Sequence, residues 1–247
     1  MSKVIVANDK GGVGKSLVTQ GLVLAAAEAG SKPVVIEVES TPRLGRVLGE
    51  VISIQPPTHD PDVLYRDPDT IFAVWDEMAA AVAAPSAIVD IGANLFRPFA
   101  RWAAAGGARQ LAGGDGLTVV AVMTMDQHAL SAGLAALRET GAVLPAARRV
   151  AVLNPVIADF IDGDQKIAGL IKAAEAGGGA IDVIRLERMT APAWGHLMNM
   201  GRLDAAITNP AVERELLTFL PAGKVARSLA VYQTWYAGLI KALSDLV

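Results

Sequence analysis

A glycine-rich stretch near the amino terminus constrains the fold more than any other feature of the chain. Residues 11–16 read GGVGKS, between the aliphatic run KVIVAN at residues 3–8 and a helix-compatible run at residues 15–30. A strand, a glycine loop and a helix in this order let backbone N–H groups converge on phosphate oxygens at the helix N-terminus. We therefore predict a phosphate-binding loop, with an ordinary glycine turn as the alternative.

The polar residues of this loop have expected partners on a bound nucleotide. The Lys15 ammonium is expected to reach the β- and γ-phosphates, and the Ser16 hydroxyl to ligate Mg²⁺. The next side chain, Leu17, has no hydrogen-bonding group, so only its backbone can contact an α-phosphate. The predicted nucleotide-binding residues of the loop are Gly11, Gly12, Val13, Gly14, Lys15, Ser16 and Leu17.

Further aliphatic runs alternate with helix-compatible segments along most of the chain, which predicts an α/β fold with a doubly wound, mostly parallel sheet flanked by helices. We expect a single domain over residues 1–247, with a helical carboxy-terminal part from about residue 209. Residues 105–116 (AGGARQLAGGDG) and 174–182 (AEAGGGAID) are predicted to be loops. The predicted later strands lie within residues 32–39, 51–55, 86–92, 117–126, 148–155 and 180–186.

Composition excludes several function classes. The chain has no cysteine, which excludes disulfides, thiolate chemistry and cysteine-ligated metal clusters. Its net charge of −3 gives no overall attraction to nucleic acid or anionic lipid. No apolar run approaches the roughly 20 residues that span a bilayer, so we expect a cytoplasmic protein.

A second motif supplies a carboxylate for the metal. Asp90 follows three apolar residues at the end of the predicted strand in residues 86–92, and Gly92 comes two positions later. A nucleotide loop needs such a carboxylate to hold the water shell of Mg²⁺, and a glycine lets the backbone approach a γ-phosphate. The alternative is an aspartate that caps the next helix.

The stretch NDKGGVGKS at residues 8–16 resembles the deviant Walker A motif of the ParA/MinD family, cytoplasmic ATPases that position plasmids, chromosomes and division machinery. The resemblance covers roughly the first two-thirds of the chain. It implies ATP and Mg²⁺ as cofactors and an ATP-dependent homodimer in which Lys10 contacts the nucleotide of the partner. It also implies that Asn154, with Pro155, helps to seat the adenine; a turn-forming Asn before Pro is the alternative.

The chain departs from the family at the end of the second predicted strand. Relatives usually carry an Asp-x-Asp-Pro pattern there, whereas this chain has Glu37 and Glu39, and its proline is displaced to Pro42. The longer side chains can still orient water with altered geometry, so we expect slow hydrolysis. The predicted catalytic set is Lys10, Lys15, Glu39 and Asp90, and the predicted metal set is Ser16, Glu37 and Asp90.

The resemblance also implies nonspecific binding of duplex DNA and an adaptor or activator protein. The DNA candidates are interspersed with acids, so solvated surface charge is the competing interpretation; they are Arg185, Arg188, Arg202, Arg214, Lys224 and Arg227. A second basic cluster consists of Arg97, Arg101 and Arg109. The final helical stretch carries too few cations for an anionic membrane and is expected to pack on the domain. The three histidines, at positions 59, 128 and 196, have no metal-ligand spacing.

Three functions follow from these motifs. The leading prediction is an ATP-dependent dimerising switch in plasmid partition, stability or conjugal DNA transfer, similar to the TraL and StbB branch. A MinD-like positioning ATPase that acts on a membrane or protein is the second. The third is an ATP-dependent synthetase of the dethiobiotin or cobyrinate type, for which the sequence offers no cluster of substrate-binding residues.

Overall fold

A seven-stranded sheet forms the centre of the computed structural model, which describes residues 2–57, 60–67, 69–111, 116–160, 165–176, 178–197 and 201–247. The strands are all parallel and lie in the order β3-β2-β4-β1-β5-β6-β7. The predicted fold class is confirmed. The strands are β1 (Lys3–Ala7), β2 (Val34–Val38), β3 (Ile52–Ile54), β4 (Ala87–Ile91), β5 (Leu117–Met123), β6 (Arg148–Leu153) and β7 (Asp182–Arg185).

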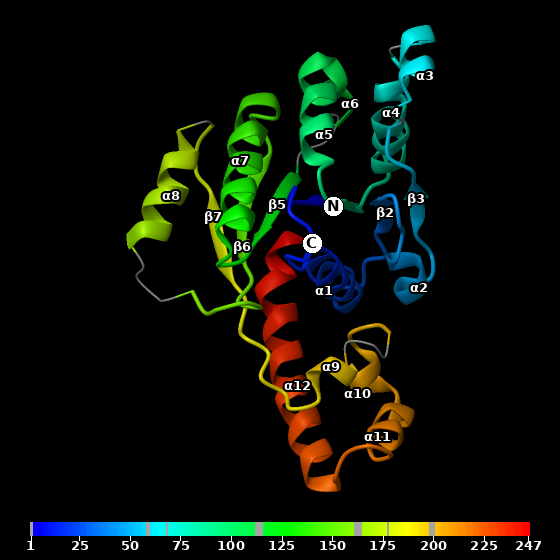
Figure 1. Cartoon of the computed structure of the whole chain (residues 1–247), viewed down its shortest axis with the longest axis vertical. Coiled ribbons are helices and arrows are strands. Elements are labelled where there is room, and N and C mark those ends of the chain that lie inside the picture. Colours follow the sequence, from blue (N-terminus) through cyan, green and yellow to red (C-terminus); the bar gives the residue numbers. More distant parts are fainter. Residues whose placement is uncertain are drawn as a thin grey trace.

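Helices cover both faces of the sheet (Figure 1). Alternate residues of β1 point to opposite sides: Val4 and Val6 pack with α1 and α12, whereas Ile5 packs with α4 and α5. The helices are α1 (Lys15–Glu28), α2 (Leu44–Leu48), α3 (Pro61–Arg66), α4 (Thr70–Val82), α5 (Phe96–Trp102), α6 (Ala108–Leu111), α7 (Gln127–Val143), α8 (Gln165–Glu175), α9 (Trp194–Leu197), α10 (Ala205–Thr208), α11 (Pro210–Leu216) and α12 (Ala222–Leu243).

The strand order reverses at β1, because the chain passes to β2 on one side of it and to β5 on the other. β1 is bonded to β4 and β5, so the loops that follow β1, β4 and β2 come together at the carboxyl edge of the sheet. Ligands of open parallel sheets bind at such a switch point. The fold therefore gathers the glycine loop, Asp90 and the glutamates of β2 at one place.

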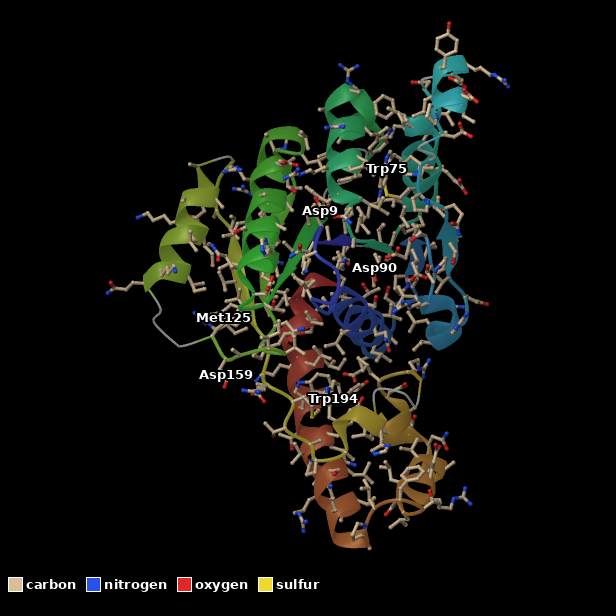
Figure 2. The ribbon with its side chains drawn as sticks, viewed as in Figure 1. Asp9, Trp75, Asp90, Met125, Asp159 and Trp194 are labelled. Atoms are coloured by element: carbon tan, nitrogen blue, oxygen red, sulfur yellow. The ribbon has the colours of Figure 1, made fainter. Side chains whose placement is uncertain are left out.

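The last helix, α12, anchors a group of short helices. Figure 1 shows α9, α10 and α11 beside the first half of α12, away from the sheet. Trp194, labelled in Figure 2, packs edge-on against Trp235 at 5.2 Å between ring centroids. The Tyr232 hydroxyl donates to the Leu203 carbonyl at 2.6 Å. The expected packing of the final helix is confirmed, because Leu239, Ile240 and Leu243 are buried.

The prediction of a loop at residues 105–116 was wrong for residues 105–111, whereas residue 116 lies outside any helix or strand. Residues Ala103–Gly107 form a π-helical turn that leads into α6, with a kink at Gly106, whose φ angle is 120°. Gly107 lets the Trp102 ring pack against the backbone, because a β-carbon at this position would lie 2.1 Å from that ring. The glycine therefore marks the close approach of an indole and not the end of a helix. Of the other predicted loop, residues 174 and 175 belong to α8, and position 177 lies outside the described residues.

The contact between α1 and α12 gives a test of the fold. A β-carbon on Gly21 would lie 2.7 Å from Leu243 Cδ1. We predict that Gly21→Val lowers the free energy of unfolding by about 1–3 kcal/mol, because overpacking moves α12 away from α1. Urea denaturation measures it. Gly169→Ala in α8, where a β-carbon meets open space, is the control and should raise stability by about 0.5–1 kcal/mol. Equal stability of Gly21→Val and wild type would contradict the packing.

Candidate nucleotide-binding site

The glycine loop between β1 and α1 has the backbone shape of an anion cradle. Gly12 and Gly14 have φ angles of 77° and 97°, a left-handed conformation that favours glycine. Gly14 is the N-cap residue of α1, and no side chain in the described part of the chain caps that helix end. The first N–H groups of a 14-residue helix are therefore free to bind phosphate oxygens, and the helix dipole favours an anion there.

Two buried asparagines hold the loop in place. The Asn8 amide donates to the Val122 and Ala129 carbonyls at 2.7 and 2.9 Å, and its oxygen accepts from the Lys10 N–H at 2.8 Å. The Asn154 amide donates to the Val13 carbonyl at 2.9 Å. Sequence reasoning missed Asn8; its position directly after four apolar residues, Val4–Ala7, was the available signal.

The contact of Asn154 with the loop also explains Gly14. A β-carbon at position 14 would lie 2.3 Å from the Asn154 amide nitrogen. Asn154 and Pro155 are both buried, so Asn154 lies against the loop backbone. Its predicted contact with adenine stays a prediction.

The Lys15 side chain folds back over the loop. Its ammonium donates to the Asn8 carbonyl at 3.0 Å and to the Lys10 carbonyl at 3.3 Å. Burial lowers the pKa of Lys15, and the nearby carboxylates of Asp90, Glu39 and Asp9 oppose that shift. A buried ammonium held by carbonyl dipoles gains most from an anionic ligand, because the carbonyls offer only partial charges.

A cavity of about 630 Å³ lies beside the loop. Its lining combines the loop with the ends of β2 and β4, including Gly11, Gly12, Gly14, Lys15, Ser16, Leu17, Glu37, Glu39, Arg43, Asp90 and Gly92. The structure therefore brings most of the predicted phosphate, metal and water-orienting residues together around one cavity. Four predicted residues do not line it: Lys10, Val13, Asn154 and Pro155. The Val13 carbonyl instead accepts from the Asn154 amide.

Among the predicted metal-binding residues, Asp90 has a buried carboxylate oxygen, Oδ2, without a hydrogen-bond partner in the described part of the chain. Burial raises the pKa of Asp90 to about 7, although the Lys15 ammonium and the Ser16 hydroxyl both lower it. A divalent cation near Ser16 and Asp90 would satisfy that oxygen, so these residues fit Mg²⁺. No cluster of three or more His, Asp or Glu side chains suited to a metal occurs in the described residues.

The two glutamates of β2 have different surroundings. Both oxygens of Glu37 accept backbone N–H groups, from Arg43 at 2.9 and 3.0 Å and from Leu44 at 3.0 Å. Glu39 accepts from the Ser40 N–H and hydroxyl, both at 2.9 Å. A β-carbon on Gly92 would lie 2.6 Å from Glu39 Oε2. Gly92 thus makes room for the Glu39 carboxylate, a reason that the sequence did not reveal.

Lys10 lies on the outer side of the loop. It is exposed, and its ammonium makes no ion pair with any described residue. The preceding Asp9 ties this edge of the loop to the chain after β4: its carbonyl accepts from the Asn94 N–H at 3.1 Å and its carboxylate from the Phe96 N–H at 2.9 Å. Figure 2 shows Asp9 at the base of α5. A cavity of about 430 Å³ lined by Lys10, Asp9 and residues of α5 and α7 opens there.

The predicted DNA-binding residues lie on several elements of the fold, and two of them are paired with acids. Arg188 pairs with Asp159 at 3.3 Å, and Arg202 pairs with Asp204 at 2.6 Å. Arg185 ends β7, whereas Arg214, Lys224 and Arg227 belong to α11 and α12. Of the second cluster, Arg97 lies 3.8 Å from the Asp9 carboxylate, and Arg101 and Arg109 lie in α5 and α6. His59 lies outside the described residues.

Comparison with models of known protein families identifies the family of this chain. The family model for the CobQ/CobB/MinD/ParA nucleotide-binding domain matches residues 4–218, from β1 to the segment after α11. The chain belongs to this family. Neither the family model nor the structural comparisons single out the TraL and StbB branch, which stays a prediction.

Two solved structures align with most of the chain. MinD from Aquifex aeolicus aligns with 13% identity and a TM-score of 0.44, over 95% of this chain and 97% of that one. MinD in the MinC:MinD cell division protein complex from Aquifex aeolicus aligns with 14% identity and a TM-score of 0.40, over 95% and 96% of the two chains. A search among curated proteins returned no match. Within the described residues, no helix is long and apolar enough to cross a membrane.

The raised pKa of Asp90 makes stability depend on pH. The folded state favours the protonated form of Asp90. The contribution of this carboxyl group to the free energy of unfolding is therefore complete below its ordinary pKa of 3.8, and it is lost as the pH rises to about 7. We predict that Asp90→Asn, which does not titrate, becomes more stable than wild type as the pH rises from 4 to 7, by at most about 4 kcal/mol. Urea denaturation of both proteins with EDTA and without nucleotide measures this difference. Parallel pH profiles would contradict it.

Proposed function

We propose that this chain is an ATPase that uses ATP to dimerise and so switches its affinity for a partner. One observation carries the proposal: the loop holds two lysines in opposite situations. Lys15 is buried over the loop and lines the cavity, whereas Lys10 is exposed on the outer edge without an ion pair among the described residues. One cation is placed for the nucleotide of its own protomer, and the other is free to reach a nucleotide in a second protomer.

The two lysines are also linked to each other. The Lys15 ammonium donates to the Lys10 carbonyl at 3.3 Å. A phosphate that draws the ammonium into the cavity removes this bond and changes the environment of the Lys10 backbone. Nucleotide binding in one protomer thereby acts on the residue that meets the other protomer.

Hydrolysis follows from the groups around the cavity. A water oxygen bonds to the γ-phosphorus while the bond to the bridging oxygen breaks, giving ADP, inorganic phosphate and a proton. Glu39, held against Gly92 by its bonds to Ser40, is placed to orient that water. When bound, Mg²⁺ stabilises negative charge on the phosphates, and Ser16 and Asp90 are the residues that would hold it.

The partners follow the family resemblance. Duplex DNA and an adaptor protein are the proposed targets of the dimer, and dimerisation would double any basic surface. The pairing of Arg188 and Arg202 with acids leaves Arg214, Lys224 and Arg227 as the stronger DNA candidates. A positioning role on a membrane or protein, as in MinD, is the second proposal. The synthetase alternative predicts an oligomeric state that does not change with nucleotide.

The test measures molar mass by light scattering after size exclusion, with ADP or with a nonhydrolysable ATP analogue and Mg²⁺. We predict a dimer for wild type only with the ATP analogue, and a monomer for Lys10→Ala, which should bind nucleotide as wild type does. Lys10→Ala should also lose most hydrolysis, because contacts of this kind in trans contribute about 10³–10⁵ in rate.

The control is Lys32→Ala, which removes an exposed lysine that pairs with Glu50 at 2.7 Å and lies outside the cavity. It should behave as wild type. Duplex DNA added at low and high salt in the same experiment tests the DNA target, because counterion release predicts binding that weakens steeply with salt. A Lys10→Ala protein that dimerises normally would contradict the proposed role of Lys10.

A further inference from the structure

Arg43 is a cationic residue of the nucleotide-binding cavity that the proposed function does not use. It follows β2 and lines the same cavity as Lys15, Ser16 and Asp90. Lys15 and Arg43 are the two cationic residues of that lining, one from the loop and one from the chain after β2. The cavity therefore has a positive residue on each of two walls.

The Arg43 guanidinium has no partner within the described part of the chain. It makes no ion pair or hydrogen bond there, although Glu37, Glu39 and Asp90 line the same cavity. Glu37 is occupied by backbone N–H groups and Glu39 by Ser40. An exposed arginine at the mouth of a phosphate-binding cavity, with carboxylates nearby that do not pair with it, is available to an anionic ligand.

Glu37 fixes the backbone that carries this arginine. Glu37 is 3% exposed, and its carboxylate accepts from the N–H groups of Arg43 and Leu44, where α2 begins. A charged acceptor makes strong hydrogen bonds to backbone N–H groups at a helix start. An aspartate at position 37 would be one methylene shorter and would not reach these groups without movement of the chain. The replacement of the usual aspartate by Glu37 thus has a structural reason.

We propose that Arg43 contacts the terminal phosphate of the nucleotide bound in its own protomer, and that Glu37 is the positioning residue that holds Arg43 at the cavity. The inference rests on the proposed function, since it requires a triphosphate in this cavity. A planar guanidinium suits the task, because it can donate two parallel hydrogen bonds to phosphate oxygens. Arg43 acts in cis, whereas Lys10 acts in trans, so the two contacts are separable.

The test compares affinities for a nonhydrolysable ATP analogue and for ADP, both with Mg²⁺, by titration with fluorescent derivatives. Arg43→Ala should bind the triphosphate about tenfold more weakly, as expected for one charge-assisted contact, and ADP as wild type does. Arg43→Lys should recover part of the loss. The control is Arg46→Ala, which removes an exposed arginine one turn further along α2 that does not line the cavity.

Glu37→Asp tests the positioning role. It should reduce the preference for triphosphate over diphosphate in the wild-type background and have no further effect in the Arg43→Ala background, since both changes remove the same contact. Additive effects would show that Glu37 acts independently of Arg43. Melting temperatures of the variants without nucleotide check that each one folds.

The outcomes separate this inference from the proposed function. Wild type that binds neither nucleotide overturns both. Wild type that prefers the triphosphate, together with an Arg43→Ala variant that keeps the same preference, overturns the role of Arg43 alone. An equal loss of ADP and triphosphate affinity in Arg43→Ala also overturns it, because that pattern places the contact away from the terminal phosphate.

Discussion

The anchoring of the glycine loop by Asn8 and Asn154 is the interaction on which the site depends. Glycines allow the loop many conformations, and a cradle for phosphate needs one of them. Asn8 bonds the start of the loop to β5 and α7, and Asn154, at the end of β6, bonds its middle through the Val13 carbonyl. Each buried amide finds carbonyl partners, so the anchoring carries no unpaired polar group at these atoms. The loop is therefore shaped before any ligand arrives.

The charges around this loop are arranged for a ligand. Lys15 and Asp90 are both buried, and burial works against the charged form of each. Among the residues that the structure describes, one oxygen of Asp90 has no hydrogen-bond partner, and the Lys15 ammonium donates to carbonyl groups. A phosphate and a divalent cation together would satisfy both groups, which is the physical reason for assigning a nucleotide and metal to the cavity.

Much of the fold could be predicted because the strands are continuous aliphatic runs separated by helix-compatible segments. The short helices were not predictable in this way: α2 depends on the carboxylate of Glu37, and the turn at residues Ala103–Gly107 depends on the Trp102 ring against Gly107. In the site, the loop and Asp90 follow from local patterns. The partners of Asn8, Glu37 and Gly92 do not, because each lies on a different strand or loop that only the fold brings close.

The central claim is that each nucleotide is served by Lys15 from its own protomer and by Lys10 from the other. The most direct test mixes two variants that are each expected to lose most hydrolysis, Lys10→Ala and Asp90→Asn, and measures ATP hydrolysis. In a mixed dimer the Lys10→Ala protomer keeps its own Asp90 and receives Lys10 from its partner, so one complete site forms. We predict that the mixture hydrolyses ATP at a substantial fraction of the wild-type rate. A rate equal to the sum of the two separate variants would contradict the claim.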